Sequence, residues 1–391
     1  MALAACASNT SGDDTSASQE TSSSQPAGDS SSEAPSETEA ASESESADDS
    51  SSETPAETAA PAAEVKLGLA YDLGGRGDQS FNDSAARGLD KAESEGMTVI
   101  NKLTAQNGEP DSAKIDRLNQ LIKDGANAIV AVGFAYAGAL ADVAGKNPDV
   151  NFAIVDDASL CSTPDQGGVE GAPFANVDCM TFAAEQGSFL VGVAAALTSK
   201  SGKVGFIGGV DVPLIQTFQA GFDAGVKAAN ADAEISDKYI TEPPDFGGFN
   251  DPASGERIAK GMYDAGTDVI YAAAGGSGAG VFKAAKAAGA WGIGVDSDQY
   301  NAPTLADVKD VILTSMVKNV DVAVYDFFSS ANAGTPLTGT HVYDLASGGV
   351  GFSTSGGFVD SIASQLDDYQ QKIISGEIEV HNYETDSQCP L

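Results

Sequence analysis

The stretch Val65-Lys66-Leu67-Gly68-Leu69-Ala70-Tyr71 decides the fold of this 391-residue chain. Its short apolar run is typical of a strand that is buried on both faces of a sheet. A glycine-rich loop follows it, and then a helix predicted near 83–95. The chain repeats this alternation, with strands predicted at 127–132, 151–155, 203–208, 235–240, 268–273, 291–295 and 310–316, and helices at 183–199, 212–230, 251–265, 278–289 and 319–331. Such repeated units predict an α/β fold whose parallel sheets carry helices on both faces.

The length of the folded part predicts two lobes, because residues 65–391 form a longer segment than a domain with a single hydrophobic core usually has. Ligands of doubly wound lobes bind outside the carboxyl ends of the strands, which here face a common cleft. The residues that follow the predicted strands at these ends are Asp72, Asp156-Asp157, Gly275-Gly276, Asp296 and Lys318. Ionised carboxylates at these positions could accept hydrogen bonds from ligand hydroxyl or N–H groups. Each of them could also cap a helix or form a salt bridge.

The charge and composition exclude several classes of protein. The chain carries 57 Asp and Glu against 20 Lys and Arg, a net charge of −37, which argues against nucleic-acid binding. With two histidines and four cysteines, the chain has few candidate ligands for a zinc site and few candidates for a histidine-based triad. Neither a metal nor a cofactor is therefore predicted. Apolar runs stay far below the ~18 residues of a transmembrane helix. These exclusions favour a secreted or surface-attached globular protein.

The acidic residues are concentrated at the N-terminal end. Residues 1–64 hold fourteen acids and no base, which leaves −23 for the rest of the chain. Residues 7–63 contain no aromatic residue and no Val, Ile or Leu, so 7–64 is predicted to be a disordered tether. Leu3-Ala4-Ala5-Cys6 resembles a bacterial lipobox, so residues 1–6 are interpreted as the remnant of a lipoprotein signal that ends at a lipidated Cys6.

The remaining cysteines leave the disulfide pairing open. Cys161 and Cys179 are 18 residues apart, and an extracytoplasmic location would permit a bridge between them. Cys389 would then be left over, so other pairings stay possible.

One short pattern occurs once in each predicted lobe. Ser80-Phe81-Asn82-Asp83 recurs as Gly248-Phe249-Asn250-Asp251, each time on the loop before a helix. Asn or Asp at these places can cap the helix, and the phenylalanine can be a hydrophobic staple. Alternatively, Phe81 and Phe249 could close on the two faces of a flat ring, each stack adding about 1–3 kcal/mol.

The glycine cluster at 275–280 carries no enzymatic signature. It opens a predicted helix, so its amides could bind an anion or a hydroxyl group, or the glycines could simply permit a tight turn. It lacks the last glycine of the dinucleotide-binding fingerprint, and Ala279 breaks the nucleophile-elbow pattern around Ser277. No catalytic residue is predicted.

Four blocks in register resemble the basic-membrane-protein family, bacterial lipoproteins that serve ABC transporters as purine-nucleoside receptors. The blocks are Asp72 to Gly75 with Asp78 to Asn82, Ala273 to Gly278, Gly294 to Gln299, and Thr314 to Lys318. The resemblance covers roughly residues 65–375 and implies a type I periplasmic-binding fold, two lobes joined by a hinge that the chain crosses three times. We expect lobe 1 at 65–179 plus about 318–345, and lobe 2 at 180–317 plus about 346–380.

The resemblance also implies roles for the matching residues. Phe81 and Phe249 would stack on the base, with Phe246 as the competitor of Phe249. Asp72 and Asn82 would read the edge of the base. The ribose would be held by Asp156, Asp296, Lys318 and the amides near Gly275 and Gly276, with Asp157 as the competitor of Asp156.

The function that follows is that of a receptor without catalytic activity. It would capture a purine nucleoside and deliver it to an ABC permease, as a monomer held on the outer face of the cell membrane by its lipid anchor alone. A sugar receptor of the same fold is the alternative binding function. A nucleoside hydrolase is the enzymatic alternative, because Asp296-Ser297-Asp298 superficially resembles a calcium-binding loop.

Overall fold

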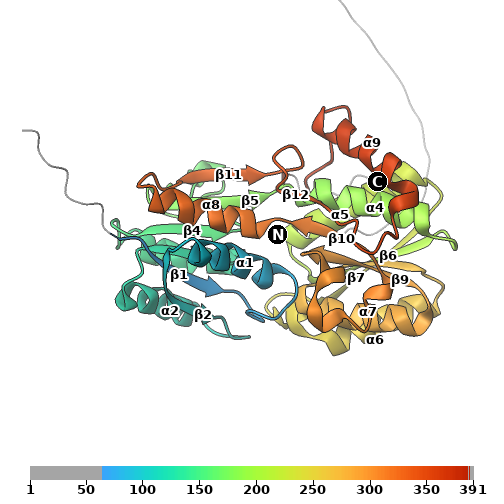
Figure 1. The fold of residues 1–391 in the computed structure, drawn as a ribbon, viewed down its shortest axis with the longest axis horizontal. Coiled ribbons are helices and arrows are strands. Elements are labelled where there is room, and N and C mark those ends of the chain that lie inside the picture. Colours follow the sequence, from blue (N-terminus) through green and yellow to red (C-terminus); the bar gives the residue numbers. More distant parts are fainter. Residues whose placement is uncertain (1–63, 386, 388–391) are drawn as a thin grey trace, which may run out of the picture. The chain divides into compact units, whose positions relative to one another are not determined.

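The computed structural model describes residues 64–385 and 387 (Figure 1). The predictions made for Cys6, for residues 1–63 and for Cys389 lie outside these residues. Among the helices of the described part, none is both long and apolar enough to cross a membrane.

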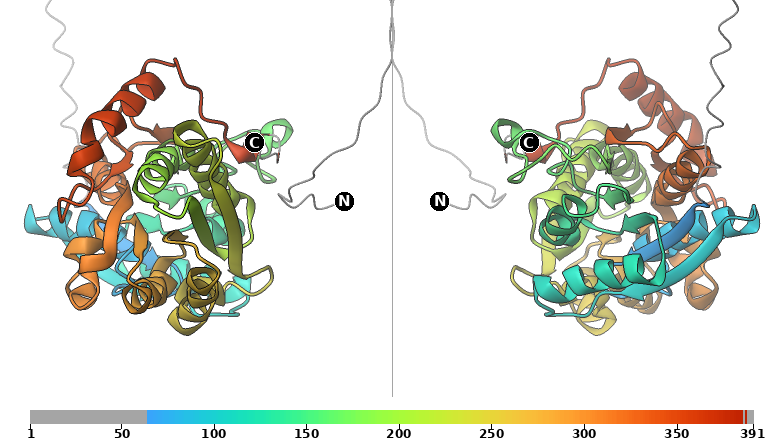
Figure 2. Two further views of the ribbon diagram at one scale, coloured as in Figure 1. Left: turned by 90° about the vertical axis from the view of Figure 1, so that its right-hand side faces the viewer. Right: turned by 90° about the vertical axis from the view of Figure 1, so that its left-hand side faces the viewer.

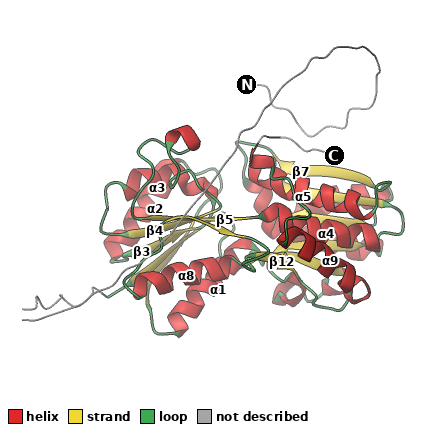
Figure 3. Ribbon diagram, turned by 90° about the horizontal axis from the view of Figure 1, so that it is seen from above, coloured by secondary structure: helices red, strands yellow, loops and turns green. Residues whose placement is uncertain are grey.

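Lobe 1 is built on a six-stranded, wholly parallel sheet with the order β11-β5-β4-β3-β1-β2. Its strands are β1 (Lys66–Tyr71), β2 (Thr98–Thr104), β3 (Ala128–Ala131), β4 (Asn151–Val155), β5 (Val177–Phe182) and β11 (Gly339–Tyr343). Its helices are α1 (Phe81–Ser94), α2 (Asp111–Asp124), α3 (Ala137–Ala144) and α8 (Val320–Asn332). Helices α1 and α8 pack together on one face of the sheet and α2 and α3 on the other (Figure 3), which explains the uninterrupted burial of β1 and β3.

Lobe 2 repeats the plan with the strand order β12-β10-β9-β8-β6-β7. Its strands are β6 (Lys203–Val210), β7 (Glu234–Thr241), β8 (Val269–Ala273), β9 (Trp291–Asp296), β10 (Ile312–Lys318) and β12 (Val350–Phe352), of which β12 runs antiparallel to β10. Its helices are α4 (Ala184–Thr198), α5 (Pro213–Ala229), α6 (Pro252–Asp264), α7 (Gly278–Ala288) and α9 (Ala363–Ile374). Helices α4 and α5 form one layer and α6 and α7 the other, with α9 packed on α4 (Figure 2).

The chain passes between the two sheets three times. It crosses from β5 to α4, returns from β10 to α8, and crosses again from β11 to β12. The prediction of doubly wound lobes joined by a three-crossing hinge is therefore confirmed. The expected lobe boundary at 179/180 falls inside β5, because this strand continues in the first sheet to Phe182.

The predicted helices and strands agree with the observed ones to within a few residues, but some elements escaped prediction. Strands β2, β5, β11 and β12 and helices α3 and α9 are among the elements found only in the structure. Strand β2 is half-buried along most of its length and lacks a clear alternation of burial. Strand β11 is held by a tertiary contact, because the Nδ1 of His341 lies 2.6 Å from the Oδ1 of buried Asp178 in β5.

The structure joins Cys161 to Cys179 in a disulfide. Cys179 is completely buried in β5, and Cys161 lies in the long loop between β4 and β5. The bridge therefore ties this loop to the strand that follows it.

Candidate functional site

A pocket lies between the lobes at the carboxyl ends of their strands. It contains about 580 Å³ of space free of protein atoms, open solvent at its mouth included. Eight of the nine residues predicted to bind ligand line it: Asp72, Phe81, Asn82, Asp156, Phe249, Gly275, Asp296 and Lys318. The ninth, Gly276, follows Gly275 and is not among the lining residues; a Cβ atom there would lie 3.2 Å from the Oδ1 of Asn250.

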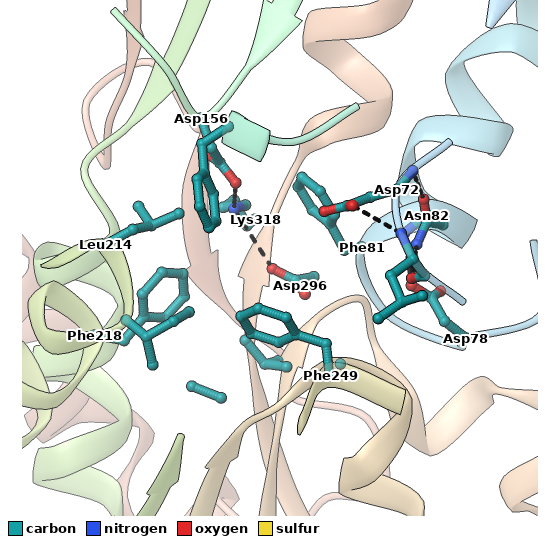
Figure 4. Close-up of a pocket in the computed structure, with 16 residues that line it drawn as sticks. Asp72, Asp78, Phe81, Asn82, Asp156, Leu214, Phe218, Phe249, Asp296 and Lys318 are labelled. Carbon is teal, nitrogen blue, oxygen red and sulfur yellow. Dashed lines mark hydrogen bonds and ion pairs between the residues drawn. The ribbon is translucent and has the colours of Figure 1, made fainter. Parts of the chain in front are cut away.

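Lys318 is the central charge of the pocket (Figure 4). It ends β10 and is 2 % exposed. Its Nζ lies 2.6 Å from the Oδ2 of Asp156 in lobe 1 and 3.8 Å from the Oδ1 of Asp296 in lobe 2. A buried lysine requires such partners. The three side chains form one ion cluster that joins the two lobes.

The two carboxylates of this cluster occupy equivalent places in the two lobes. Asp156 follows β4 and Asp296 ends β9, and both adopt a left-handed backbone conformation, with φ of 66° and 62°. Residues other than glycine rarely adopt this conformation, and they concentrate at functional sites when they do. Burial raises the pKa of Asp296, and nearby Lys318 opposes that rise.

Aromatic rings surround the ammonium group of Lys318. Its Nζ lies 4.6 Å from the centre of the Phe81 ring, 5.3 Å from that of Phe182 and 5.4 Å from that of Phe218. At these distances the quadrupole of each ring attracts the cation. The lysine is therefore held both by its carboxylates and by the rings.

Phe249 occupies the second aromatic position predicted from the sequence. It lies in a 3₁₀ turn (Gly247–Asn250), and its ring packs against Gly209, where a Cβ atom would come within 2.4 Å of the ring. Phe249 lines the pocket together with Phe81 from lobe 1. The competing Phe246 instead packs against Phe134, with ring centres 6.1 Å apart. The geometry thus favours Phe249 as the counterpart of Phe81.

Asp72 and Asn82 are linked to each other at the start of lobe 1. The backbone N–H of Asp72 donates to the Oδ1 of Asn82 at 2.9 Å, and the Nδ2 of Asn82 donates to the Leu73 carbonyl and to Asp78. Both amide hydrogens of Asn82 are therefore used inside the protein, and its side chain is 1 % exposed. The side chain thus holds the loop that carries Asp72, and the expected contact of Asn82 with a base edge stays a prediction.

Asp78 is a site residue that the sequence prediction missed. Its carboxylate accepts hydrogen bonds from the backbone N–H groups of Ser80, Asn82 and Asp83 and from the amide of Asn82. Asp78 therefore caps α1 and fixes the loop before it. In the sequence, Asp78 could have been recognised as a capping residue because it lies two residues before Ser80, the N-cap of α1.

Apolar residues of α5 form a wall that the sequence also did not reveal. Leu214, Ile215 and Phe218 line the pocket from this helix, and Phe134 lines it from the loop after β3. Helical spacing marks the three α5 residues as core, but it cannot tell a core face from a pocket wall. Phe134 could have been predicted as a pocket residue, because it follows the predicted strand 127–132 at the end where ligands bind.

Asp157, next to Asp156, and Asp298, two residues after Asp296, are not among the residues that line the pocket. The Oδ1 of Asp157 accepts hydrogen bonds from the N–H and hydroxyl of Ser159. The carboxylate of Asp298 accepts hydrogen bonds from Ser353, Ser355 and Asn301. Within the described residues, no three His, Cys, Asp or Glu side chains are grouped so that they could hold a metal ion. Asp296-Ser297-Asp298 thus does not present its two carboxylates to one point.

Asp72 makes the pocket sensitive to pH. Burial raises the pKa of its carboxyl from 3.8 to about 6, and the carboxylates of Asp156 and Asp78 act in the same direction. A raised pKa means that the folded protein binds this proton more tightly than the unfolded chain, so the charge of Asp72 reduces stability as the pH rises from about 4 to above 6.

We therefore expect Asp72→Asn to stabilise the ligand-free protein at pH 8, by at most about 3 kcal/mol, and to leave stability at pH 4 unchanged. Urea unfolding at the two pH values measures this. A gain at pH 4 equal to that at pH 8 would contradict the assignment.

Comparison with known proteins identifies the family. A family model described as ABC transporter substrate-binding protein, PnrA-like, matches residues 65–384. The chain belongs to this family. The ABC transporter nucleoside-binding protein BmpA of Lactococcus lactis is 33 % identical over 81 % of this chain and 89 % of its own length. The CD4+ T-cell-stimulating antigen of Listeria monocytogenes is 37 % identical over 81 % and 88 %.

The fold of this chain is also similar to that of a solved ABC transporter solute-binding protein. An ABC transporter solute-binding protein from Aeropyrum pernix superimposes with a TM-score of 0.67 and 28 % identity, over 81 % of this chain and 93 % of that protein. The chain is thus a substrate-binding protein of an ABC transporter, with the type I fold, and such proteins work outside the cytoplasm. The family matches from residue 65, where the acidic segment ends.

Proposed function

We propose that this substrate-binding protein captures a purine nucleoside between its lobes and delivers it to its ABC permease. The observation that carries the proposal is the composition of one pocket: an aromatic ring from each lobe and a carboxylate from each lobe beside one lysine. Flat heterocycles stack on aromatic rings, whereas carboxylates bind hydroxyl groups. The nucleoside-binding relative from Lactococcus supports the same ligand class.

Each side of the ligand has its own partners in this proposal. Phe81 and Phe249 stack on the base, and the carboxylate of Asp72 accepts an N–H from the base edge. Asn82 holds the Asp72 loop in place. Asp156, Asp296, Lys318 and the backbone at Gly275 bind the ribose hydroxyls. The protein performs no chemistry on its ligand, and lobe closure around the ligand is the functional step.

Titration calorimetry on ligand-free protein tests the proposal. Purine nucleosides are expected to bind, and pyrimidine nucleosides and free pentoses serve as comparisons. Ribose binding as tight as that of a nucleoside would support the sugar-receptor alternative. If no nucleoside binds, the proposal fails. Release of free base from inosine with calcium present would instead support a hydrolase.

The ribose assignment predicts a selective effect of Asp296→Asn. Asparagine tolerates the left-handed backbone of this position, so the change removes mainly the charge. We expect ribonucleoside binding to weaken by about 1.5–3 kcal/mol, the value of a hydrogen bond to a charged group, while binding of the free base changes little. Calorimetry with inosine and hypoxanthine measures the difference. Equal losses for both ligands would contradict the assignment, and Asp298→Asn is the matched control.

We also propose that Cys6 is lipidated and anchors a monomeric protein to the outer face of the membrane, with residues 7–64 as the tether. The lipobox-like Leu3-Ala4-Ala5-Cys6 and the family membership support this.

A further inference from the structure

Ser80, a residue of lobe 1, forms hydrogen bonds with residues of lobe 2. This residue precedes α1 in lobe 1 and is completely buried. Its Oγ lies 2.6 Å from the Oδ2 of Asp296 and 3.2 Å from the carbonyl of Val295, both in lobe 2. In return, the hydroxyl of Ser297 donates to the carbonyl of Ser80 at 2.8 Å. One residue of lobe 1 is thus hydrogen-bonded to lobe 2 through its side chain and its backbone.

A second contact lies beside the first. The Nε2 of Gln299 donates to the carbonyl of Gln79 across the lobes at 3.0 Å, while its Oε1 accepts the N–H of Val295 at 3.0 Å. Gln299 is 1 % exposed, so the contact is shielded from water. Residues 79–80 of lobe 1 and residues 295–299 of lobe 2 are therefore in direct contact in this arrangement of the lobes.

Ser80 holds the Asp296 carboxylate more closely than Lys318 does. The hydroxyl of Ser80 is 2.6 Å from one carboxylate oxygen, whereas the Nζ of Lys318 is 3.8 Å from the other. Lys318 is held instead by Asp156 at 2.6 Å. The short hydrogen bond from Ser80 therefore contributes more to the orientation of Asp296 than the longer contact with Lys318 does.

We infer that Ser80 is a positioning residue, which orients Asp296 for the ligand and makes this orientation depend on lobe closure. The inference rests on the proposed function. When the lobes separate, Asp296 loses its short hydrogen bond, and the ribose loses an ordered partner. Closure and ligand binding therefore favour each other, since each stabilises the same arrangement of Asp296.

Ser80→Ala tests the inference against Ser188→Ala. Ser188 is also completely buried, but its hydroxyl contacts Tyr271 within lobe 2. We expect Ser80→Ala to weaken inosine binding about tenfold in calorimetry, the loss of one hydrogen bond to a charged group. In an Asp296→Asn background the same change should cost less than about threefold. Additive losses, or an equal loss in Ser188→Ala, would overturn the inference.

Hydrogen exchange of the ligand-free, full-length protein provides a readout that needs no nucleoside. In Ser80→Ala, peptides that cover 295–301 should exchange about tenfold faster than in the unchanged protein. Ser188→Ala should leave them unchanged. Unchanged exchange in Ser80→Ala would overturn the inference even if nucleosides bind. Failure of the unchanged protein to bind any nucleoside would instead refute the proposed function. The exchange result would still report whether Ser80 orders the segment around Asp296.

Discussion

Replacing Lys318 with methionine is expected to destabilise the protein by about 3–5 kcal/mol and to abolish ligand binding. The change removes the positive charge from between Asp156 and Asp296, whose side chains are 5 % and 8 % exposed. Two buried carboxylates then lose their nearest counter-charge, which is the costly arrangement. Urea unfolding at pH 8 measures the loss of stability, and calorimetry measures the loss of binding.

The pH dependence of this variant separates an electrostatic cause from a packing defect. Lys318 opposes the rise that burial causes in the pKa of Asp296, so without Lys318 that pKa should rise further and stability should fall as the pH rises. At pH 4 the deficit should be much smaller than at pH 8. The triple variant Lys318→Met, Asp156→Asn, Asp296→Asn should recover stability without recovering binding. An equal deficit at both pH values would show that the cluster is not the cause.

Removing both pocket phenylalanines is expected to have the largest effect on affinity. Each base–aromatic stack contributes about 1–3 kcal/mol, so Phe81→Ala combined with Phe249→Ala should weaken nucleoside binding by about 2–6 kcal/mol. The affinity for ribose, if measurable, should change far less. Titration calorimetry of the two single variants and the double variant gives the three values.

Phe246→Ala is the matched control for this pair. Phe246 lies on the same loop as Phe249 but packs against Phe134 instead of lining the pocket. We expect its loss to weaken binding by less than about 1 kcal/mol. If Phe246→Ala weakens binding more than Phe249→Ala does, the second stacking residue has been assigned wrongly.

The sequence predicted the charged half of the pocket better than its apolar half. Asp72 and Asp156 follow strands, and Asp296 and Lys318 end them; the topology of parallel sheets brings such residues to one edge. Phe218 and Leu214 lie on a helix whose apolar face looks like ordinary core, so only the packed structure shows which part of that face is left open.

The role of Asn82 was beyond sequence reasoning for a related reason. An asparagine before a helix can cap it, bind a ligand or fix a loop, and the residue type does not distinguish these uses. The structure adds that both amide hydrogens are donated inside the protein. Strand β11 likewise pairs with β5, which is far away in the chain, and adds the contact between His341 and Asp178.

The disulfide between Cys161 and Cys179 has a consequence for how the protein should be prepared. The bridge closes a loop that begins shortly after Asp156, and loop closure of this length is worth about 3 kcal/mol. Material produced in a reducing cytoplasm would lack this restraint next to the ion cluster, whereas material exported to an oxidising compartment would keep it. Affinities measured on the two preparations are therefore not interchangeable, and the thiol content of a sample should be determined before its binding is compared.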